Sequence, residues 1–200
     1  MDATALALRS AFSTRRAGGP AEPRGRPATR LGLAGLAAHV FFELAAGVGM
    51  PFASIAGPVP AAGMWTVGTG GLWRAAKTRP ASADPVFAAV NGLGLAAIVA
   101  HMAGWPRRRT RLGLPWLQDC EGLGPELMRF YNPILYAGGA ACLAGLVREN
   151  RTAPAGVPLA ALALTPVLVA VQHGEFRRLR LAAAIAPGWW NRRLRRTSRD

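Results

Sequence analysis

Five ionisable side chains lie within or beside strongly apolar stretches of this chain: His39, Glu43, His101, His173 and Glu175. An ionisable group in an apolar stretch is costly to bury and is therefore a candidate for function. His39 and Glu43 are four residues apart, so a helix places them on one face, where they can interact. Histidine and carboxylate side chains act as general acids and bases. Two histidines with a carboxylate also bind zinc or non-haem iron.

We therefore predict a polar site that contains all three histidines of the chain. The candidate catalytic residues are His39, Glu43, His101 and His173, and the candidate metal ligands are His39, His101, His173 and Glu175. A single divalent metal ion is the cofactor that such residues would hold. However, no spacing matches a known metal signature, because the pair His39 and Glu43 lacks the second histidine of an HExxH motif. The alternative is a structural role, in which these side chains hydrogen-bond and fix helix packing.

The elements that must position these residues are long apolar stretches separated by short basic runs. Of the 200 residues, 51% are hydrophobic and 17% are charged, and the charges are concentrated between the apolar stretches. About twenty helical residues cover the roughly 30 Å hydrocarbon core of a bilayer. We predict an all-α polytopic membrane bundle with four transmembrane helices, at residues 31–50, 86–105, 130–147 and 155–172. Pro166 is expected to kink the last of these helices.

Residues 51–73 are uncharged, but they are rich in proline and glycine. Both residue types are poor helix formers. We predict a re-entrant or interfacial segment here, with Trp65 and Trp73 at the depth of the lipid headgroups. The alternative is a fifth transmembrane helix.

The net charge of +14 is distributed in a way that indicates membrane topology. Basic residues flank the apolar stretches and do not line one face of a domain, which makes nucleic-acid binding a poor explanation. Four spans place 19 of the 24 basic residues on one side, whereas five spans divide them 11 to 13. Because cytoplasmic flanks collect arginine and lysine, we predict a multi-pass protein of the plasma (inner) membrane with both termini in the cytoplasm.

Three regions follow from this topology. Residues 1–30 form an Arg-rich flexible cytoplasmic tail, residues 31–173 form the transmembrane bundle, and residues 174–200 form a basic amphipathic cytoplasmic tail. Arginine with tryptophan is typical of a helix that lies on anionic lipid. The predicted lipid-binding residues are Arg177, Arg178, Arg180, Trp189, Trp190, Arg192 and Arg193. A solvated tail that acts only as a topology signal is the alternative.

Three classes of function fit these features. We expect a small integral membrane protein that acts as a non-catalytic partner or scaffold, with basic tails that bind anionic lipids. One alternative is a membrane-embedded, metal-dependent enzyme that acts on a lipid-like substrate, and another is a small proton-coupled carrier or carrier subunit. Glycine-rich helix faces would allow a homo-oligomer or a membrane protein partner. The loop over residues 112–133 is interpreted either as a lid over the bundle or as a connector into the next helix.

Overall fold

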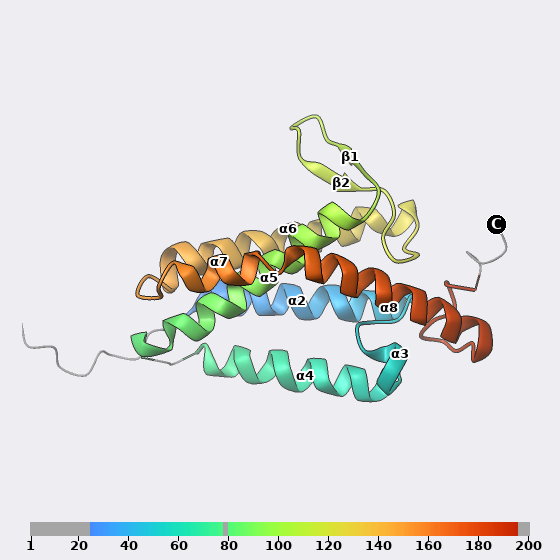
Figure 1. The fold of residues 1–200 in the computed structure, drawn as a ribbon, viewed down its shortest axis with the longest axis horizontal. Coiled ribbons are helices and arrows are strands. Elements are labelled where there is room, and N and C mark those ends of the chain that lie inside the picture. Colours follow the sequence, from blue (N-terminus) through green and yellow to red (C-terminus); the bar gives the residue numbers. More distant parts are fainter. Residues whose placement is uncertain (1–24, 78–79, 196–200) are drawn as a thin grey trace, which may run out of the picture.

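The structure is a computed structural model that describes residues 25–77 and 80–195. Its long helices lie side by side in a bundle, and a short hairpin projects from one end (Figure 1). The helices are α2 (Pro27–Ala46), α3 (Ala53–Ala56), α4 (Pro58–Ala75), α5 (Asp84–Gly104), α6 (Pro125–Ala144), α7 (Gly156–Leu162) and α8 (Thr165–Ile185). A 3-10 turn (Ala81–Ala83) precedes α5, a π-helical turn (Gly145–Glu149) continues α6, and the hairpin pairs β1 (Arg107–Arg109) with β2 (Pro115–Leu117). The predicted helical bundle is confirmed, and the hairpin is an addition to it.

Proline marks the starts of the long helices. Pro27 opens α2, Pro85 lies in the first turn of α5, and Pro125 opens α6. Proline is favourable there because its fixed φ suits the helix and its missing N–H has no partner in the first turn. Pro166 likewise lies in the first turn of α8. The predicted last span is therefore interrupted directly before Pro166, between the end of α7 at Leu162 and the start of α8 at Thr165.

One end of the bundle is defined by contacts among Arg26, Asp84 and Glu149, and we call it the Asp84 end. The Arg26 guanidinium donates to Asp84 Oδ1 at 2.6 Å, which joins the start of α2 to the start of α5. The backbone N–H groups of Ala28 and Thr29 donate to Glu149 at 2.6 and 2.9 Å, which adds the end of the α6 helix. Helices α2 and α5 therefore both begin at this end.

The opposite end is defined by Ala46, Trp105 and Arg193, and we call it the His101 end because His101 lies in the last turn of α5. The Arg193 guanidinium donates to the Ala46 carbonyl at 2.9 Å, which ties the chain beyond α8 to the end of α2. A basic group at the C-terminus of a helix stabilises the exposed carbonyls and the helix dipole. Helix α8 passes the ends of α2 and α5, and the chain that follows it returns to the end of α2 (Figure 1).

Helix α4 corrects the four-span prediction. It is one continuous helix of 18 residues that returns the chain along α2 to the Asp84 end, where Arg30 lies 3.7 Å from the centroid of the Trp73 ring (Figure 1). A re-entrant segment is therefore wrong. Because α4 returns the chain, α2 and α5 run parallel, whereas four spans would require them to run antiparallel.

The composition of α4 explains this result. Pro58 and Pro60 lie in its first turn, where proline costs little. Its glycines lower helix propensity by about 1 kcal/mol each. In an apolar environment, however, the backbone has no water to bond and must satisfy its own N–H and C=O groups, which favours a helix.

Two predicted boundaries also move. Helix α2 begins at Pro27, so Arg26 and Arg30 belong to the bundle and not to the predicted tail at residues 1–30. Residues 1–24 of that tail lie outside the described part of the chain. Helix α8 continues to Ile185, so the predicted tail at residues 174–200 begins within a helix. Its last residues, 196–200, are also not described.

The described surface is apolar in the way expected of a membrane protein. Three stretches of helix are long and apolar enough to cross a bilayer: Ala81–Gly104, Pro125–Glu149 and Gly156–Ile185. Large apolar side chains on the outside include Val67 at 76% exposed, Val99 at 43% and Val171 at 53%. Polar side chains such as Asn91 and Asn132 are instead buried. Many exposed large apolar side chains together with buried polar ones are the arrangement expected of helices in contact with lipid.

Candidate metal centre

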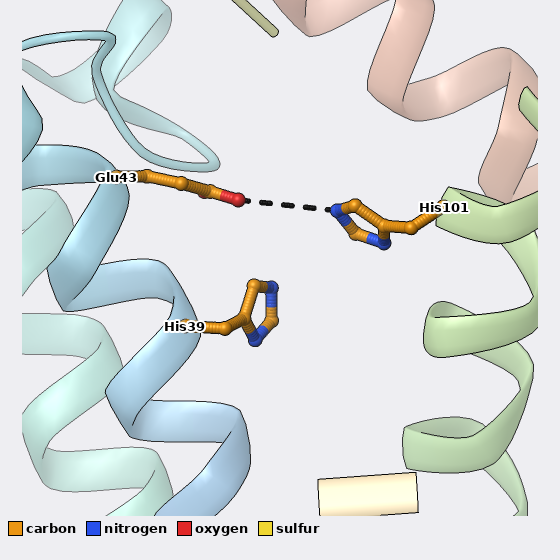
Figure 2. Close-up of side chains that lie close together, drawn as sticks. All are labelled: His39, Glu43 and His101. Atoms are coloured by element: carbon orange, nitrogen blue, oxygen red, sulfur yellow. Dashed lines mark ion pairs between the residues drawn. The ribbon is translucent and has the colours of Figure 1, made fainter. Parts of the chain in front are cut away.

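Three of the predicted site residues converge at the His101 end of the bundle. His39 and Glu43 project from α2 and His101 projects from α5, and all three point toward one another (Figure 2). One ligand atom from each residue lies within 4.8 Å of the others. All three residues are buried, and Glu43 is only 1% exposed. The pairing of His39 with Glu43 on one helix face is as expected, and the approach of His101 brings in a second helix.

Glycines let the helix backbones approach closely enough for this convergence. A Cβ atom on Gly35 of α2 would lie 2.7 Å from the Cα of Gly138 in α6. A Cβ on Gly94 of α5 would lie 2.8 Å from the Sγ of Cys142 in α6. Small residues at such crossings are typical of membrane helices. The space that remains beside His39 and His101 is a cavity of about 10 Å³, which is the size of one water molecule.

The backbone of α5 orients the His101 ring. Its Nδ1 lies 2.8 Å from the carbonyl oxygen of Ala97, and because a carbonyl only accepts, Nδ1 carries the hydrogen. In the neutral ring, Nε2 then holds a free electron pair, and it lies 3.9 Å from Glu43 Oε1. The backbone of Leu36 lies near the His39 ring. A metal-binding histidine commonly donates its other N–H to a carbonyl, as His101 does here.

Tyr131 of α6 completes the inner part of the site. Its hydroxyl donates to Glu43 Oε1, and the tyrosine side chain is buried. The Tyr131 ring centroid lies 6.3 Å from that of His39 and 6.2 Å from that of His101. Among the described ion pairs, Glu43 faces only His101 and no arginine or lysine. The carboxylate is therefore oriented by a neutral partner, and no basic side chain neutralises it.

A loop brings two further potential ligands to His101. Ligand atoms of His101, Cys120 and Glu121 lie within 4.8 Å of one another. Asn132 of α6 anchors the loop, because its Oδ1 accepts from the Leu117 N–H at 2.9 Å and its Nδ2 donates to the Leu117 carbonyl at 3.1 Å. The apolar side chains of this loop enter the bundle core. The loop over residues 112–133 is therefore both a cover for this end of the bundle and a connector into α6.

The loop groups are short of compensating positive charge. Burial raises the pKa of the Cys120 thiol well above its usual range, and the nearby acids Glu121, Glu43 and Asp119 add to this effect. Burial also raises the pKa of Glu121 well above its usual range, and the negative charges of Glu43 and Glu175 raise it further. Desolvation and like charges both disfavour an ionised carboxylate. A bound cation would relieve both effects.

His173 and Glu175, which were predicted to join this site, contact other groups. The His173 ring packs against Trp105 with centroids 4.6 Å apart. Glu175 accepts hydrogen bonds from Ser54 Oγ at 2.6 Å and from the Arg178 guanidinium at 2.8 Å. Neither belongs to the two ligand groups found in the described residues. The direction of α8 places both residues at the correct end, but its rotation turns them toward α3 and the end of α5.

Cys120, Glu121 and Tyr131 are site residues that are absent from the predicted catalytic and metal-binding sets. The available signal was the run Asp119-Cys120-Glu121 directly before an apolar helix that carries Tyr131 near its start. That pattern predicts polar groups at one end of the bundle. It does not predict that the side chains of the loop point toward His101.

The predicted lipid-binding residues divide into two groups. Arg192 donates to the Ala45 carbonyl at 3.0 Å and, like Arg193, bonds the C-terminus of α2, while Trp190 packs against the core. Arg177 and Trp189 are exposed. Arg178 is about half-exposed and pairs with Glu175, and the Arg180 guanidinium lies 5.9 Å from the Phe176 ring centroid. The first group contacts the end of α2 and the core, and the second group lies on α8 or, for Trp189, on the chain just beyond it.

Comparisons of this chain with protein-family models, with curated proteins and with solved structures find no match. Its function must therefore be inferred from the geometry of the site.

Proposed function

We propose that this chain is an integral membrane protein that binds one divalent transition-metal ion through His39, Glu43 and His101. The observation that carries the proposal is the convergence of their ligand atoms to within 4.8 Å in a buried position. Two histidines and one carboxylate are the ligands of many zinc and non-haem iron sites, and they leave further coordination positions open. The hydrogen bond from His101 to the Ala97 carbonyl supports the same role, since it directs the second ring nitrogen toward a metal.

The charges around the site favour a divalent cation over a purely structural polar cluster. A buried charge is costly unless an opposite charge is nearby. Glu43 supplies one negative charge, and Cys120 or Glu121 can supply a second, so that a divalent ion is neutralised within the site. Without a cation, the acids face one another and no described arginine or lysine pairs with Glu43 or Glu121.

The size of the site limits what the metal could act on. The cavity beside His39 and His101 is about 10 Å³, so it admits a water-sized ligand and not a lipid chain. A site for a lipid-like substrate would need a larger cavity, and a proton-coupled carrier would need a hydrated path to Glu43, which is 1% exposed. We therefore favour a metal site with a water-sized ligand over these two alternatives.

Metal analysis of the purified protein in detergent tests this proposal. The wild-type protein is expected to retain about one zinc, iron or cobalt ion per chain after exhaustive dialysis, because His39, Glu43 and His101 together can hold one ion. His39→Ala, Glu43→Gln and His101→Ala should each lose it. His173→Ala is the matched control, because His173 lies at the same end of the bundle but packs against Trp105. Retention of the ion by His39→Ala, or its absence from the wild type, would overturn the proposal.

For the membrane arrangement, we propose that α2, α4, α5, α6 and the α7–α8 pair all cross the bilayer. The support is the return of the chain by α4 along α2 and the packing of α2 against α5 and α6, two of the three apolar candidates (Figure 1). With five crossings, positions before Arg26 and after residue 195 lie on opposite sides. This proposal replaces the prediction that both termini are cytoplasmic. With five crossings the basic residues divide almost evenly between the two sides of the membrane, so their distribution indicates no preferred orientation.

Reporter fusions distinguish the two arrangements. A reporter placed before Arg26 and a second one placed after Lys77 should report the same side of the membrane if five helices cross. They should report opposite sides if residues 51–73 do not cross. A fusion within the hairpin, after Thr110, serves as the control, because it must differ from the Lys77 position under either arrangement.

We also propose that the surface of α8 contacts anionic lipid. Exposed Arg177 and Arg178 lie on the same helix as exposed Leu181 and Ile185, and basic and apolar groups together favour the interface. Added phosphatidylglycerol should raise the melting temperature of the purified protein more than phosphatidylcholine does. The variant Arg177→Gln/Arg178→Gln should lose this difference, whereas Arg151→Gln, at the other end of the bundle, should keep it. An equal response of both variants would contradict the assignment.

A further inference from the structure

We propose that the hairpin of β1 and β2 binds the phosphate headgroup of an anionic phospholipid, and that Arg107 and Arg109 contact the phosphate. This site is separate from the candidate metal centre and from the surface of α8. It rests on the proposed crossing of the bilayer by α5, because that crossing places the hairpin at the membrane surface.

An open cavity beside the hairpin carries the proposal. Its volume is about 450 Å³, which is within the usual range for pockets that bind small molecules. The residues that line it lie directly after α5 and in the hairpin, and they include Trp105, Arg107, Arg108, Arg109, Gly113 and Pro115. Among the described residues, none of those that line the cavity is acidic. The cavity therefore suits an anion.

The strand geometry places Arg107 and Arg109 on the same face of β1. The two residues are two positions apart in a strand, so their side chains extend to one side with their Cα atoms about 7 Å apart. Pro115 pairs with Arg109 across the hairpin and therefore lies on this face as well. All three residues line the cavity. Two guanidinium groups at this spacing can bond one phosphate together, each through a pair of N–H groups.

Both guanidinium groups are held in place, but no acidic side chain neutralises them. Arg107 donates to the Ala103 carbonyl at 3.3 Å, and Arg109 donates to the Gly113 carbonyl at 3.2 Å. A guanidinium group has five N–H donors, so each arginine keeps most of its donors for a ligand. The ion pairs found in the described part of the chain include neither residue. A bound anion would supply the missing negative charge.

Hydrogen bonds fix the backbone of the hairpin against the bundle. The Tyr136 hydroxyl of α6 donates to the Pro115 carbonyl of β2. The Gln118 N–H donates to the Pro106 carbonyl at 2.9 Å, which closes the open end of the hairpin next to α5. The cavity is therefore preformed, and a preformed site lowers the entropic cost of binding.

Two features of the hairpin favour a lipid headgroup over a soluble phosphate. Leu112 and Leu114 at its tip are 86% and 48% exposed. The hairpin also extends sideways from the bundle, across the direction of the helices (Figure 1), so that a crossing of α5 lays it along the membrane surface. Basic groups next to exposed apolar side chains favour the interface, where the apolar side chains enter the acyl region and the basic groups stay with the phosphates. A soluble anion would gain nothing from the leucines.

Native mass spectrometry of the purified protein, titrated with phosphatidylglycerol in detergent, tests the site through the affinity for the first bound lipid. Each variant is made in the Arg177→Gln/Arg178→Gln protein, so that the surface of α8 does not contribute. Arg107→Gln and Arg109→Gln should each lower the affinity about tenfold or more, because hydrogen bonds from a charged group are lost. Arg109→Lys should also weaken binding, since an ammonium group cannot form the paired bonds.

Arg111→Gln is the matched control. It removes the same charge from the same hairpin, but Arg111 does not line the cavity. We expect it to change the affinity less than about threefold, as is usual for an exposed charge. The arginines of the hairpin are all exposed, so every variant should keep the wild-type melting temperature.

The tip of the hairpin distinguishes a lipid from a soluble ligand. Leu112→Ser/Leu114→Ser should weaken phosphatidylglycerol binding about tenfold, because apolar contact with the acyl region is lost. The wild-type protein should bind glycerol 3-phosphate far more weakly than phosphatidylglycerol. Equal affinity for the two would make a soluble phosphate the ligand and would overturn the proposal.

Two further results would count against the site. Equal losses of affinity in Arg109→Gln and Arg111→Gln, or wild-type affinity in Arg109→Lys, would indicate diffuse attraction by charge and no defined site. Neither result bears on the crossing of α5, which the reporter fusions test separately. If those fusions show that α5 does not cross, the membrane arrangement itself fails.

Discussion

The two ends of the bundle both bury polar side chains, but they satisfy them very differently. At the Asp84 end, each buried acid accepts several short hydrogen bonds. At the His101 end, several potential metal ligands converge with few bonds among them. Because buried polar groups are normally hydrogen-bonded, the first arrangement is what a structural network requires. The second leaves electron pairs directed at a common point, as a ligand site does.

The acids of the Asp84 end are each bonded several times. Glu149 accepts from the Ala28 N–H at 2.6 Å, the Thr29 N–H at 2.9 Å and the Thr29 hydroxyl at 2.8 Å. Asp84 accepts from Arg26 at 2.6 Å and from the Thr152 hydroxyl at 2.7 Å. These bonds join α2, α5 and the end of α6. Each acid acts as a cross-link between elements and has no free position for a ligand.

The His101 end shows convergence with little pairing. Glu43 accepts one hydrogen bond, from Tyr131, and lies 3.9 Å from His101 Nε2. That separation is too long for a hydrogen bond. It is short enough for one ion to bind both atoms, because metal–ligand distances are near 2 Å. Substitutions at the two ends should therefore affect different measurements.

The largest effect on stability is expected at the Asp84 end. Asp84→Ala would remove the carboxylate that pairs with the Arg26 guanidinium, which is 1% exposed. Removing one member of a buried ion pair costs about 3 kcal/mol or more in free energy of unfolding. Unfolding in mixed detergent, followed by tryptophan fluorescence, measures this. Glu43→Gln in the metal-free protein should change stability by less than about 1 kcal/mol. An equal loss in both variants would remove the distinction between the two ends.

The next effect concerns metal affinity and should occur only at the His101 end. Glu43→Gln removes a direct ligand of the metal. Loss of a residue that only hydrogen-bonds to a ligand already lowers metal affinity about 10–100-fold. We therefore expect Glu43→Gln to lower the Zn²⁺ affinity at least about 100-fold. Glu149→Gln changes an acid to its amide in the same way at the opposite end and serves as the control. Isothermal titration with Zn²⁺ measures both variants. A comparable loss in Glu149→Gln would indicate a general effect of unfolding.

Tyr131→Phe should have an intermediate effect on metal affinity. Its hydroxyl orients Glu43 but is not itself required as a ligand. Loss of such a partner should weaken Zn²⁺ binding about 10-fold. Tyr136→Phe is the matched control, because Tyr136 lies in the same helix as Tyr131 but its hydroxyl donates to the Pro115 carbonyl of β2. If Tyr131→Phe abolishes binding as fully as Glu43→Gln does, Tyr131 must be a direct ligand.

Much of this comparison could be predicted from the sequence, but not all of it. The pairing of His39 with Glu43 follows from helix periodicity, and the position of His101 near the end of its helix follows from the basic run that begins at Arg107. The direction of α2 relative to α5 was wrong, because it depended on residues 51–73. Glycine and proline content argues against a helix there, whereas the requirement for internal backbone bonding in an apolar environment favours one.

The residues missed at the site share one physical cause. Cys120 and Glu121 lie in a loop, and a loop has no periodicity from which the direction of a side chain can be read. Their inward position depends on Asn132 bonding to the Leu117 backbone and on Leu194 packing against Gly122. Both are contacts between distant parts of the chain. His173 was included among the predicted ligands for a related reason. Its position along α8 could be estimated from the sequence, but the direction of its side chain about the helix axis depends on packing against Trp105.

The smallest expected effect tests whether the Asp84 end is purely structural. The Thr29 hydroxyl donates to Glu149 at 2.8 Å and accepts from the Asn91 amide at 2.8 Å. Thr29→Val keeps the shape of the side chain but removes both bonds, and it leaves Asn91 and Glu149 with fewer partners. Because a lost buried hydrogen bond costs about 1–2 kcal/mol, the free energy of unfolding should fall by that amount while Zn²⁺ affinity stays unchanged.

Thr66→Val is the control, since the Thr66 hydroxyl is exposed and bonds to the Ala62 carbonyl of its own helix. This variant should change the free energy of unfolding by less than about 0.5 kcal/mol. If Thr29→Val weakens Zn²⁺ binding, the two ends are coupled through α2, and the Asp84 end then helps to position His39 and Glu43.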